Sequence, residues 1–242
     1  MLFRSLFLLI LGQNLILSGD KWKNNFFLLI TKFYAMKTTM KILPLMLGIM
    51  LFFTQCSKDN ENVNDGGLNL PKDASFTLIF FSELNDPRSY FQTIVLDGPL
   101  EGVYEGWCLD SYSTIQSKKG YVGKVYSSLS KNIPDLFDYQ ENLPLINWVI
   151  NYDFVGKESL GGHGKYTIGD VTKSLWSLLE ETPNPDPAGG VGSFNNNRVI
   201  EIVEMAFIEG KEFVPLCGEF LAVILVVEGK QTTMIKYPFP CP

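Results

Sequence analysis

Four cysteines, at positions 56, 108, 217 and 241, have the side chains best suited to chemistry in this chain. Cys108 lies in the stretch YEGWCLDSY (104–112), directly after a tryptophan and two residues before Asp110. A thiolate is a nucleophile and a metal ligand, whereas two thiols in an oxidising compartment form a disulfide. The spacing of the cysteines contains no Cys-x-x-Cys pair, so we expect no metal site and no cofactor.

His163 is the only histidine, and it lies in the glycine-rich stretch SLGGHGKY (159–166). A Ser-His-Asp or Cys-His catalytic system would have to use it, and the chain contains no G-x-S-x-G nucleophile motif. A single histidine in a loop is more often solvated than catalytic. We therefore expect that the protein is not an enzyme.

Two acidic residues, Asp110 and Asp170, lie beside apolar segments. Glycosidases need only two carboxylates at a set separation, but surface or capping roles are the more ordinary explanation for both residues. A carbohydrate-binding alternative depends on exposed aromatic rings that stack on sugars. The candidates are Tyr112, Tyr121, Tyr126 and Tyr139, for which packing within strands and loops is the simpler explanation.

Charge is unevenly distributed along the chain, which has 20 Lys and Arg against 26 Asp and Glu. Residues 1–55 hold six of the basic residues and one acid, so the remainder holds 14 basic and 25 acidic residues, a formal charge of −11. A basic, apolar head on an acidic body is typical of a targeting segment followed by an exported domain. The acidic body also disfavours nucleic acid as a partner.

Residues 36–55 have the pattern of a lipoprotein signal peptide, in which two lysines precede the apolar stretch 42–53. That stretch is too short to span a membrane. It ends at Thr54-Gln55-Cys56, which resembles a lipobox with glutamine in place of the usual small residue, and the acidic run SKDNEN follows. We expect lipidation of Cys56 and anchoring in the outer membrane or at the cell surface. An ordinary secretory peptide is the alternative.

The signal peptide and the acidic part that follows it divide the chain into predicted segments. We interpret residues 1–35 as an extension of the gene model beyond the true start; an unusual two-part leader is the alternative. Residues 56–74 are polar, acidic and rich in Asn and Gly, which predicts a flexible tether. Residues 75–242 have the size of a single domain.

Strand-like segments lie at both ends of this domain. SFTLIFFSEL (75–84) and SYFQTIVLDG (89–98) are rich in β-branched and aromatic residues and flank a turn, which predicts a hairpin. GVYEGWCLD (102–110) predicts the strand that carries Cys108, and a shorter strand follows near GKVYSSL. FLAVILVV (220–227) predicts a buried central strand with TTMIKYPF (232–239) as its partner.

The middle of the domain has helical periodicity instead. Asn142 is a predicted N-cap, and Thr167 and Asp170 have the spacing of a capping box. A third helix follows residues 195–197 and ends at Gly210. Together the segments predict an α+β fold, an antiparallel β-sheet or sandwich with about three helices inserted in the middle of the chain and packed on one side.

The domain resembles the thioester domains of bacterial cell-surface proteins over roughly residues 104–227. The stretches that carry the resemblance are, in order, GWCLD, VYSSL, ENLPLINWVIN, TIGDVTKSLWSLL and FVPLCGEFLAVILVV. In adhesins of that class, a cysteine after an aromatic residue forms an intramolecular thioester with a glutamine at the start of a helix. That bond captures a nucleophile on a host surface. The resemblance assigns the cysteine to Cys108, the helix tryptophan to Trp176 and the glutamine position to Thr172.

Threonine has no side-chain carbonyl to acylate the sulfur, so the resemblance implies a degenerate site without the reactive bond. The nearest alternative, Gln116, lies outside the motif. We then expect Cys108 to pair with Cys217, just ahead of the apolar strand. The alternatives are a Cys217–Cys241 bridge, which would hold the terminal strand, and a buried free thiol at Cys108.

These observations favour a non-enzymatic, surface-anchored lipoprotein with an adhesion or cell-envelope binding role. It would attach to the membrane through Cys56 and bind an unidentified protein or glycan. The alternatives are a carbohydrate-binding or carbohydrate-processing accessory lipoprotein and an active thioester adhesin.

Overall fold

The computed structural model describes residues 68–185, 187 and 190–241. All of them belong to the second of two compact units of the chain, Asp59–Pro242, and the first unit is Met1–Lys58. The predicted extension 1–35, the signal peptide 36–55 and the lipidated Cys56 lie outside the described residues.

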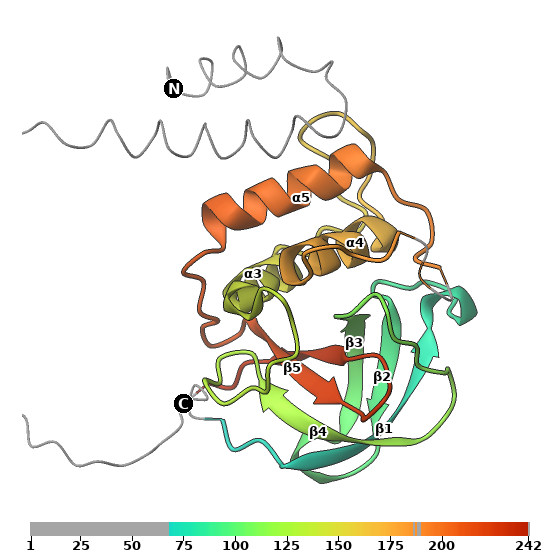
Figure 1. Ribbon diagram of the computed structural model, residues 1–242, viewed down its shortest axis with the longest axis vertical. Helices are drawn as coiled ribbons and strands as arrows, with labels where there is room; N and C mark the ends of the chain where they lie inside the picture. Colours follow the sequence, from blue (N-terminus) through green and yellow to red (C-terminus); the bar gives the residue numbers. More distant parts are fainter. Residues whose placement is uncertain (1–67, 186, 188–189, 242) are drawn as a thin grey trace, which may run out of the picture. The chain divides into compact units, whose positions relative to one another are not determined.

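Six antiparallel strands close into a barrel in the order β1-β2-β3-β6-β5-β4 (Figure 1). Residues alternate between the interior and the outside: Phe91, Thr93 and Val95 of β2 are buried, and the residues between them are partly exposed. This alternation is what the sequence pattern of the first hairpin requires. The strands are β1 (Asp73–Phe80), β2 (Phe91–Val95), β3 (Gly102–Cys108), β4 (Tyr121–Ser127), β5 (Phe220–Val226) and β6 (Thr233–Pro238).

The helices of the described residues gather on one side of the barrel (Figure 1). α3 lies against β5 and contacts both other α-helices, and α4 packs along α5. The α-helices are α3 (Leu143–Tyr152), α4 (Ile168–Leu179) and α5 (Asn196–Glu209). Three short 3-10 turns complete the set, η2 (Phe81–Glu83), η3 (Gly98–Leu100) and η4 (Gln140–Asn142).

The predicted α+β fold is confirmed, but the sheet is neither open nor a sandwich. β1 pairs with β2 on one side and with β4 on the other, and β6 lies between β3 and β5, so the sheet closes. Local patterns identify strands but not these distant pairings. The folded part also begins before residue 75, because β1 starts at Asp73 and both Leu68 and Leu70 pack against the core.

The local helix signals are confirmed in the structure. Thr167 and Asp170 form a reciprocal capping box at the start of α4, and the Asn195 side chain accepts two backbone N–H groups at the start of α5. Asn142 precedes α3 as predicted, but its side-chain amide donates to the carbonyl oxygen of Leu178 (2.7 Å). It therefore ties the start of α3 to the end of α4 instead of capping its own helix.

The disulfide differs from the pairing that the sequence favours. The structure joins Cys217 to Cys241, whose Cα atoms are 4.6 Å apart, and leaves Cys108 as a buried free thiol. The predicted Cys108–Cys217 pair is therefore wrong, and the alternative pair is present. The register of β5 and β6 explains this, because Phe220 pairs with Pro238 and each cysteine lies three residues beyond that pair.

Two asparagines of α3 join this helix to β5. The Asn151 amide donates to the Phe220 carbonyl oxygen (2.7 Å) and accepts from the Phe220 N–H (2.8 Å). One turn earlier, Asn147 Oδ1 accepts from the Ala222 N–H (2.9 Å). β4 pairs with β5 only from Val223 onward, so these side chains satisfy backbone groups of β5 beyond the end of β4. A buried backbone group left without a partner costs about 1–3 kcal/mol.

Replacing Asn151 with alanine should therefore destabilise the protein by about 2–4 kcal/mol, because both backbone groups of Phe220 lose their partner. Urea unfolding followed by circular dichroism measures this loss. Asn197→Ala is the matched control, because it removes an exposed asparagine from α5 and should change stability by less than about 0.5 kcal/mol. Equal unfolding midpoints for the two variants would contradict the role given to Asn151.

Candidate functional site

Cys108 ends β3 and pairs with Thr233 of β6. It lies on the same face of β3 as Gly106, because side chains alternate along a strand. A Cβ at Gly106 would lie 2.5 Å from Thr93 Oγ1, which places that face toward the inside of the barrel. Cys108 is accordingly 0% exposed, and the intervening Trp107 faces the helices.

The structure brings Cys108 and Trp176 together, as the resemblance implies. The Trp176 indole Nε1–H donates to the Cys108 carbonyl oxygen (3.1 Å) across 68 residues of sequence. Both residues are almost completely buried. The hydrogen bond to the backbone of Cys108 fixes the end of β3 against α4, and the same indole lies close enough to the thiol to lower its pKa slightly.

Thr172 does not replace the missing glutamine. Its hydroxyl is buried and donates to the Ile168 carbonyl oxygen one turn earlier (2.9 Å), so it hydrogen-bonds within its own helix. Gln116 is exposed in the loop before β4, where its backbone contacts the Tyr121 hydroxyl. The glutamine that lies near the Cys108 strand end is Gln231, and its Nε2–H donates to the Asp110 carbonyl oxygen (2.7 Å).

The surroundings of Cys108 keep its sulfur protonated. Burial raises the pKa of the thiol well above its ordinary value, and the negative charge of Asp110 raises it further. Only the thiolate is an effective nucleophile. This setting differs from the electropositive, partly exposed surroundings that are typical of reactive cysteines.

The two carboxylates singled out in the sequence are not a pair. Asp170 lies at the N-terminal end of α4, where it accepts from Thr167, from the Asn195 N–H (2.7 Å) and from Arg198 Nε (2.6 Å). Asp110 follows β3, and its oxygens accept from the N–H groups of Ser113 and Thr232. Both are structural acceptors, as the capping interpretation predicts.

Glu180, at the C-terminal end of α4, is a buried acid that sequence reasoning did not identify. Its carboxylate accepts from the Ser111 N–H (2.7 Å) and the Ser111 hydroxyl (2.5 Å). Burial raises its pKa, the Ser111 hydrogen bonds oppose this, and the charges of Asp110 and Asp138 raise it further. A glutamate after the last turn of an amphipathic helix has no sequence signal that distinguishes it from a surface residue.

His163 is exposed and held by its backbone. Its N–H donates to Ser159 Oγ (2.6 Å), and its carbonyl oxygen accepts from Arg198 (2.9 Å). The loop therefore presents the ring at the surface, on the α5 side of α4. None of these contacts joins it to Cys108, so the structure does not bring the two residues together as a catalytic pair.

The four tyrosines do not converge on one face. Tyr121 is buried in the barrel, and Tyr126 packs against the core. Tyr112 and Tyr139 are exposed: the Tyr112 hydroxyl donates to the Thr182 carbonyl oxygen after α4, and the Tyr139 backbone N–H donates to the carbonyl oxygen of Leu179, the last residue of α4 (3.0 Å).

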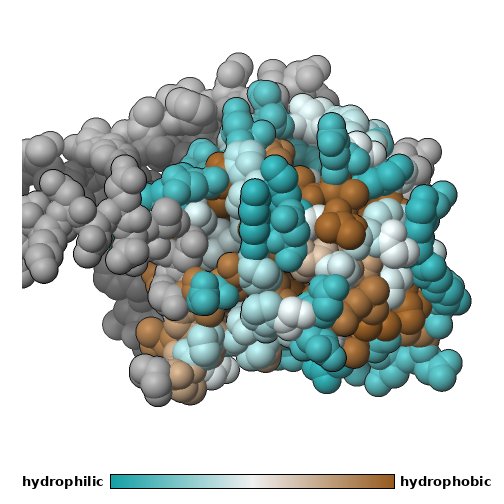
Figure 2. Space-filling model, turned by 90° about the horizontal axis from the view of Figure 1, so that it is seen from below, coloured by the Kyte–Doolittle hydropathy of each residue, from teal (hydrophilic) through white to brown (hydrophobic). Residues whose placement is uncertain are grey.

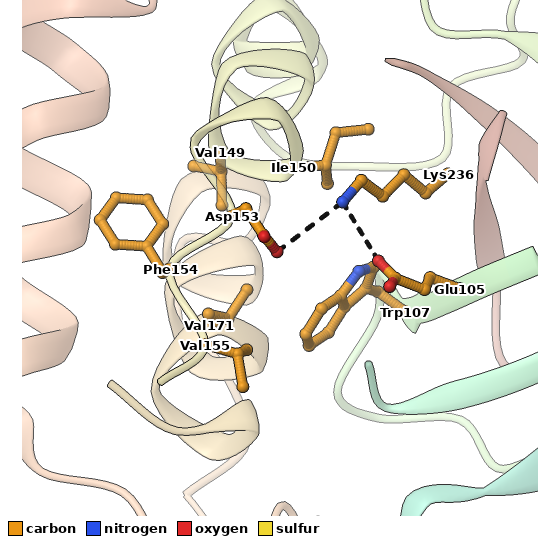
Figure 3. Close-up of a pocket in the computed structure, with 9 residues that line it drawn as sticks. All are labelled: Glu105, Trp107, Val149, Ile150, Asp153, Phe154, Val155, Val171 and Lys236. Atoms are coloured by element: carbon orange, nitrogen blue, oxygen red, sulfur yellow. Dashed lines mark hydrogen bonds and ion pairs between the residues drawn. The ribbon is translucent and has the colours of Figure 1, made fainter. Parts of the chain in front are cut away.

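A small pocket lies between the barrel and the helices (Figure 3). Its apolar lining includes Trp107, Val149 and Val171, and Glu105, Asp153 and Lys236 lie at its edge. About 10 Å³ is open to the centre of a water molecule, enough for about one water. Sites for small organic ligands occupy about 300–1,000 Å³, so this pocket in its observed form does not hold a substrate.

In the part of the chain that the structure describes, no set of three or more His, Cys, Asp or Glu side chains is arranged to hold a metal ion. None of the helices described is long and apolar enough to cross a membrane.

No family model matches this chain, and no curated protein matches it. Similar solved structures include two from Streptococcus pyogenes. One is the N-terminal domain of the pilus tip adhesin Cpa, with 11% identity over 70% of this chain and 94% of that domain and a TM-score of 0.42. The other is the N-terminal thioester domain of the fibronectin-binding protein SfbI, with 12% identity over 70% and 94% and a TM-score of 0.35.

The raised pKa of Glu180 makes a prediction about stability and pH. The folded state binds the Glu180 proton more tightly than the unfolded state, so this residue stabilises the fold as pH falls toward its ordinary pKa of 4.5. That contribution is lost as pH rises through the folded pKa. Between about pH 7 and about pH 5, the wild type should therefore gain stability relative to Glu180→Gln.

Urea unfolding of both proteins across this range measures the difference. The comparison with the variant cancels the contributions of other acids to the pH dependence of stability, including that of Glu204, whose pKa is also raised by burial. A stability difference that is independent of pH would show that Glu180 titrates normally.

Proposed function

We propose that this chain is a non-enzymatic, surface-anchored lipoprotein whose folded domain has an adhesion or cell-envelope binding role. In this proposal the thioester position is degenerate, so the domain binds without forming a covalent bond. The lipid on Cys56 attaches the protein to the outer membrane or cell surface, and the polar residues between Cys56 and Leu68 act as a tether.

The observation that carries this proposal is the state of the Cys108 site. A thioester needs a sulfur within reach of a carboxamide carbon, and it needs access for the attacking nucleophile. Here the sulfur is fully buried on the barrel side of β3, and the hydroxyl of Thr172 is bonded within α4. The Trp176 indole hydrogen-bonds to the Cys108 carbonyl oxygen, and position 172, where the resemblance places the glutamine, is a threonine.

The Cys217–Cys241 bridge supports export. Disulfides persist in oxidising compartments and are rare in the cytoplasm. The bridge agrees with the signal pattern that precedes Cys56 in the sequence. It also closes the end of the β5–β6 hairpin, where a secreted domain benefits from a covalent constraint.

Exposed apolar side chains support a binding role. α5 and the segment after it expose Phe207, Ile208, Val214 and Leu216, of which Ile208 is 74% exposed. Figure 2 shows a different face, where separate hydrophobic patches lie between hydrophilic residues. Apolar patches on a soluble domain are typical of protein interaction sites.

Intact mass spectrometry of the protein, with and without reductant and methylamine, tests the chemical part of the proposal. We expect the loss of two hydrogens from one disulfide, restored by reductant, a free thiol at Cys108 and no methylamine adduct. Loss of ammonia that methylamine reverses would instead identify a thioester and a covalent adhesin. Cys108→Ala is the matched control, because it removes the only sulfur able to form that bond.

Attachment of the producing cells to an epithelial monolayer tests the biological part. Deleting the chain should lower attachment, and the wild type and Cys108→Ala should restore it equally. Unchanged attachment after deletion would contradict the adhesion role, and failure of Cys108→Ala alone, with the protein still at the surface, would contradict the non-covalent one.

One observation favours glycan binding as a second candidate function. Tyr112, 66% exposed, contacts Thr182 after α4, Tyr139 lies next to Asp138 in the sequence and contacts the end of α4, and the Asp138 carboxylate accepts from the Glu181 N–H in the same region. Aromatic rings beside carboxylates are a common arrangement for binding sugars. Of the four tyrosines considered in the sequence, only these two are placed to take part.

Tyr112→Ala should then weaken binding to a glycan array by roughly tenfold, the effect of losing about 1.4 kcal/mol of stacking. Tyr126→Ala is the control for the array, because Tyr126 packs against the core away from this segment. Absence of any glycan signal for the wild type, or an equal loss for both variants, would remove this candidate.

A further inference from the structure

Four charged side chains form a network at the C-terminal end of α3, between the helices and the barrel, and Figure 3 shows three of them, Glu105, Asp153 and Lys236. Lys236 Nζ of β6 lies 3.1 Å from Glu105 Oε2 of β3 and 3.8 Å from Asp153 Oδ1, directly after α3. Arg88 completes the network, 2.9 Å from Asp153 Oδ2 and 3.9 Å from Glu105 Oε1. The network therefore joins α3 to two strands that lie next to each other in the barrel.

Asp153 ends α3 in the left-handed backbone region, with φ of 57°, a conformation that aspartate adopts more readily than most residues other than glycine and asparagine. Its carboxylate contacts both Arg88 and Lys236.

Lys236 is the most buried member of the network. Its side chain is 10% exposed, against 34% for Glu105, 40% for Asp153 and 58% for Arg88. The ammonium also lies 4.5 Å from the centre of the Phe220 ring, a cation–π contact. The carboxylates of Glu105 and Asp153 and the ring of Phe220 therefore hold this lysine in place.

Behind the network lies the small interlayer pocket. One wall is Trp107 of β3, and the opposite wall is Val149 and Ile150 of α3 with Val171 of α4. The walls are apolar, whereas the charged residues stand at the edge of the pocket (Figure 3). Separation of α3 from β3 would open this pocket to water.

We propose that Arg88, Glu105, Asp153 and Lys236 form an electrostatic latch that holds the C-terminal end of α3 against the barrel and keeps this pocket closed. The latch is a conformational device that goes beyond the proposed binding role. Salt weakens it, because the screening length falls from about 30 Å at 0.01 M salt to about 3 Å at 1 M. Loss of one charge weakens it in the same way.

Hydrogen exchange measured by mass spectrometry on the full chain tests the latch. Raising NaCl from about 0.01 M to about 1 M should speed exchange at residues 149–155 and at residues 105–107 by roughly two- to fivefold. Asp153→Asn should exchange at the faster rate at both salt concentrations, since asparagine tolerates the left-handed conformation but carries no charge. Lys236→Gln should behave in the same way, and both variants should keep the salt-insensitive exchange of the remaining barrel.

Lys118→Gln is the matched control, because Lys118 also has a left-handed backbone and pairs with Glu83 at 2.5 Å, on the barrel away from α3. It should leave exchange at residues 149–155 unchanged. Exchange in the wild type that does not respond to salt, or that matches the Asp153→Asn variant at low salt, would overturn the proposal. Faster exchange throughout the domain would also overturn the proposal, because the network would then contribute to global stability. Faster exchange at the end of α3 without a change at residues 105–107 would overturn it as well, because it would indicate local fraying of the helix.

Discussion

The rest of this domain depends on the hydrogen bonds that α3 makes to the backbone of β5 where β4 no longer pairs with it. β4 stops pairing with β5 at Val223, and the backbone groups of Phe220 and Ala222 beyond it are buried by the helices. Asn147 and Asn151 supply the partners that a longer strand would have supplied. A helix placed by backbone hydrogen bonds has little freedom to rotate or slide, because a shift of one residue would unpair each of them. α3 in turn positions α4, through the bond from Asn142 to the carbonyl oxygen of Leu178.

That placement also fixes the surroundings of Cys108. Once α4 is in place, Trp176 reaches the carbonyl oxygen of Cys108 and anchors the end of β3. The thiol is buried beside it, and burial disfavours the thiolate. Thr172, one turn before Trp176, satisfies its own hydroxyl within α4.

The sequence predicted those parts of the fold that local physics decides. The capping box of Thr167 and Asp170 and the cap at Asn195 each involve residues within four positions, so their spacing is visible directly. The closure of the barrel and the Cys217–Cys241 pair depend on which strands become neighbours, and periodicity carries no information on that. For the same reason, the sequence did not indicate that Glu180 and Lys236 are largely buried. Each has an ordinary local sequence, and its burial comes from segments 69 and 131 residues away.

The two ends of α4 show how position alone gives two carboxylates different roles. Asp170 stands at the N-terminal end, where the helix dipole favours a negative charge and Arg198 lies 2.6 Å away. Glu180 stands at the C-terminal end, where burial raises its pKa and the charges of Asp110 and Asp138 raise it further, against the Ser111 hydrogen bonds that lower it. A helix of 12 residues is about 18 Å long, which exceeds the separation of about 5–10 Å that glycosidase acids require. Asp110 lies close to Glu180 and not to Asp170, and the oxygens of both are occupied by backbone N–H groups and the Ser111 hydroxyl. These carboxylates therefore hold the loops around α4 in place.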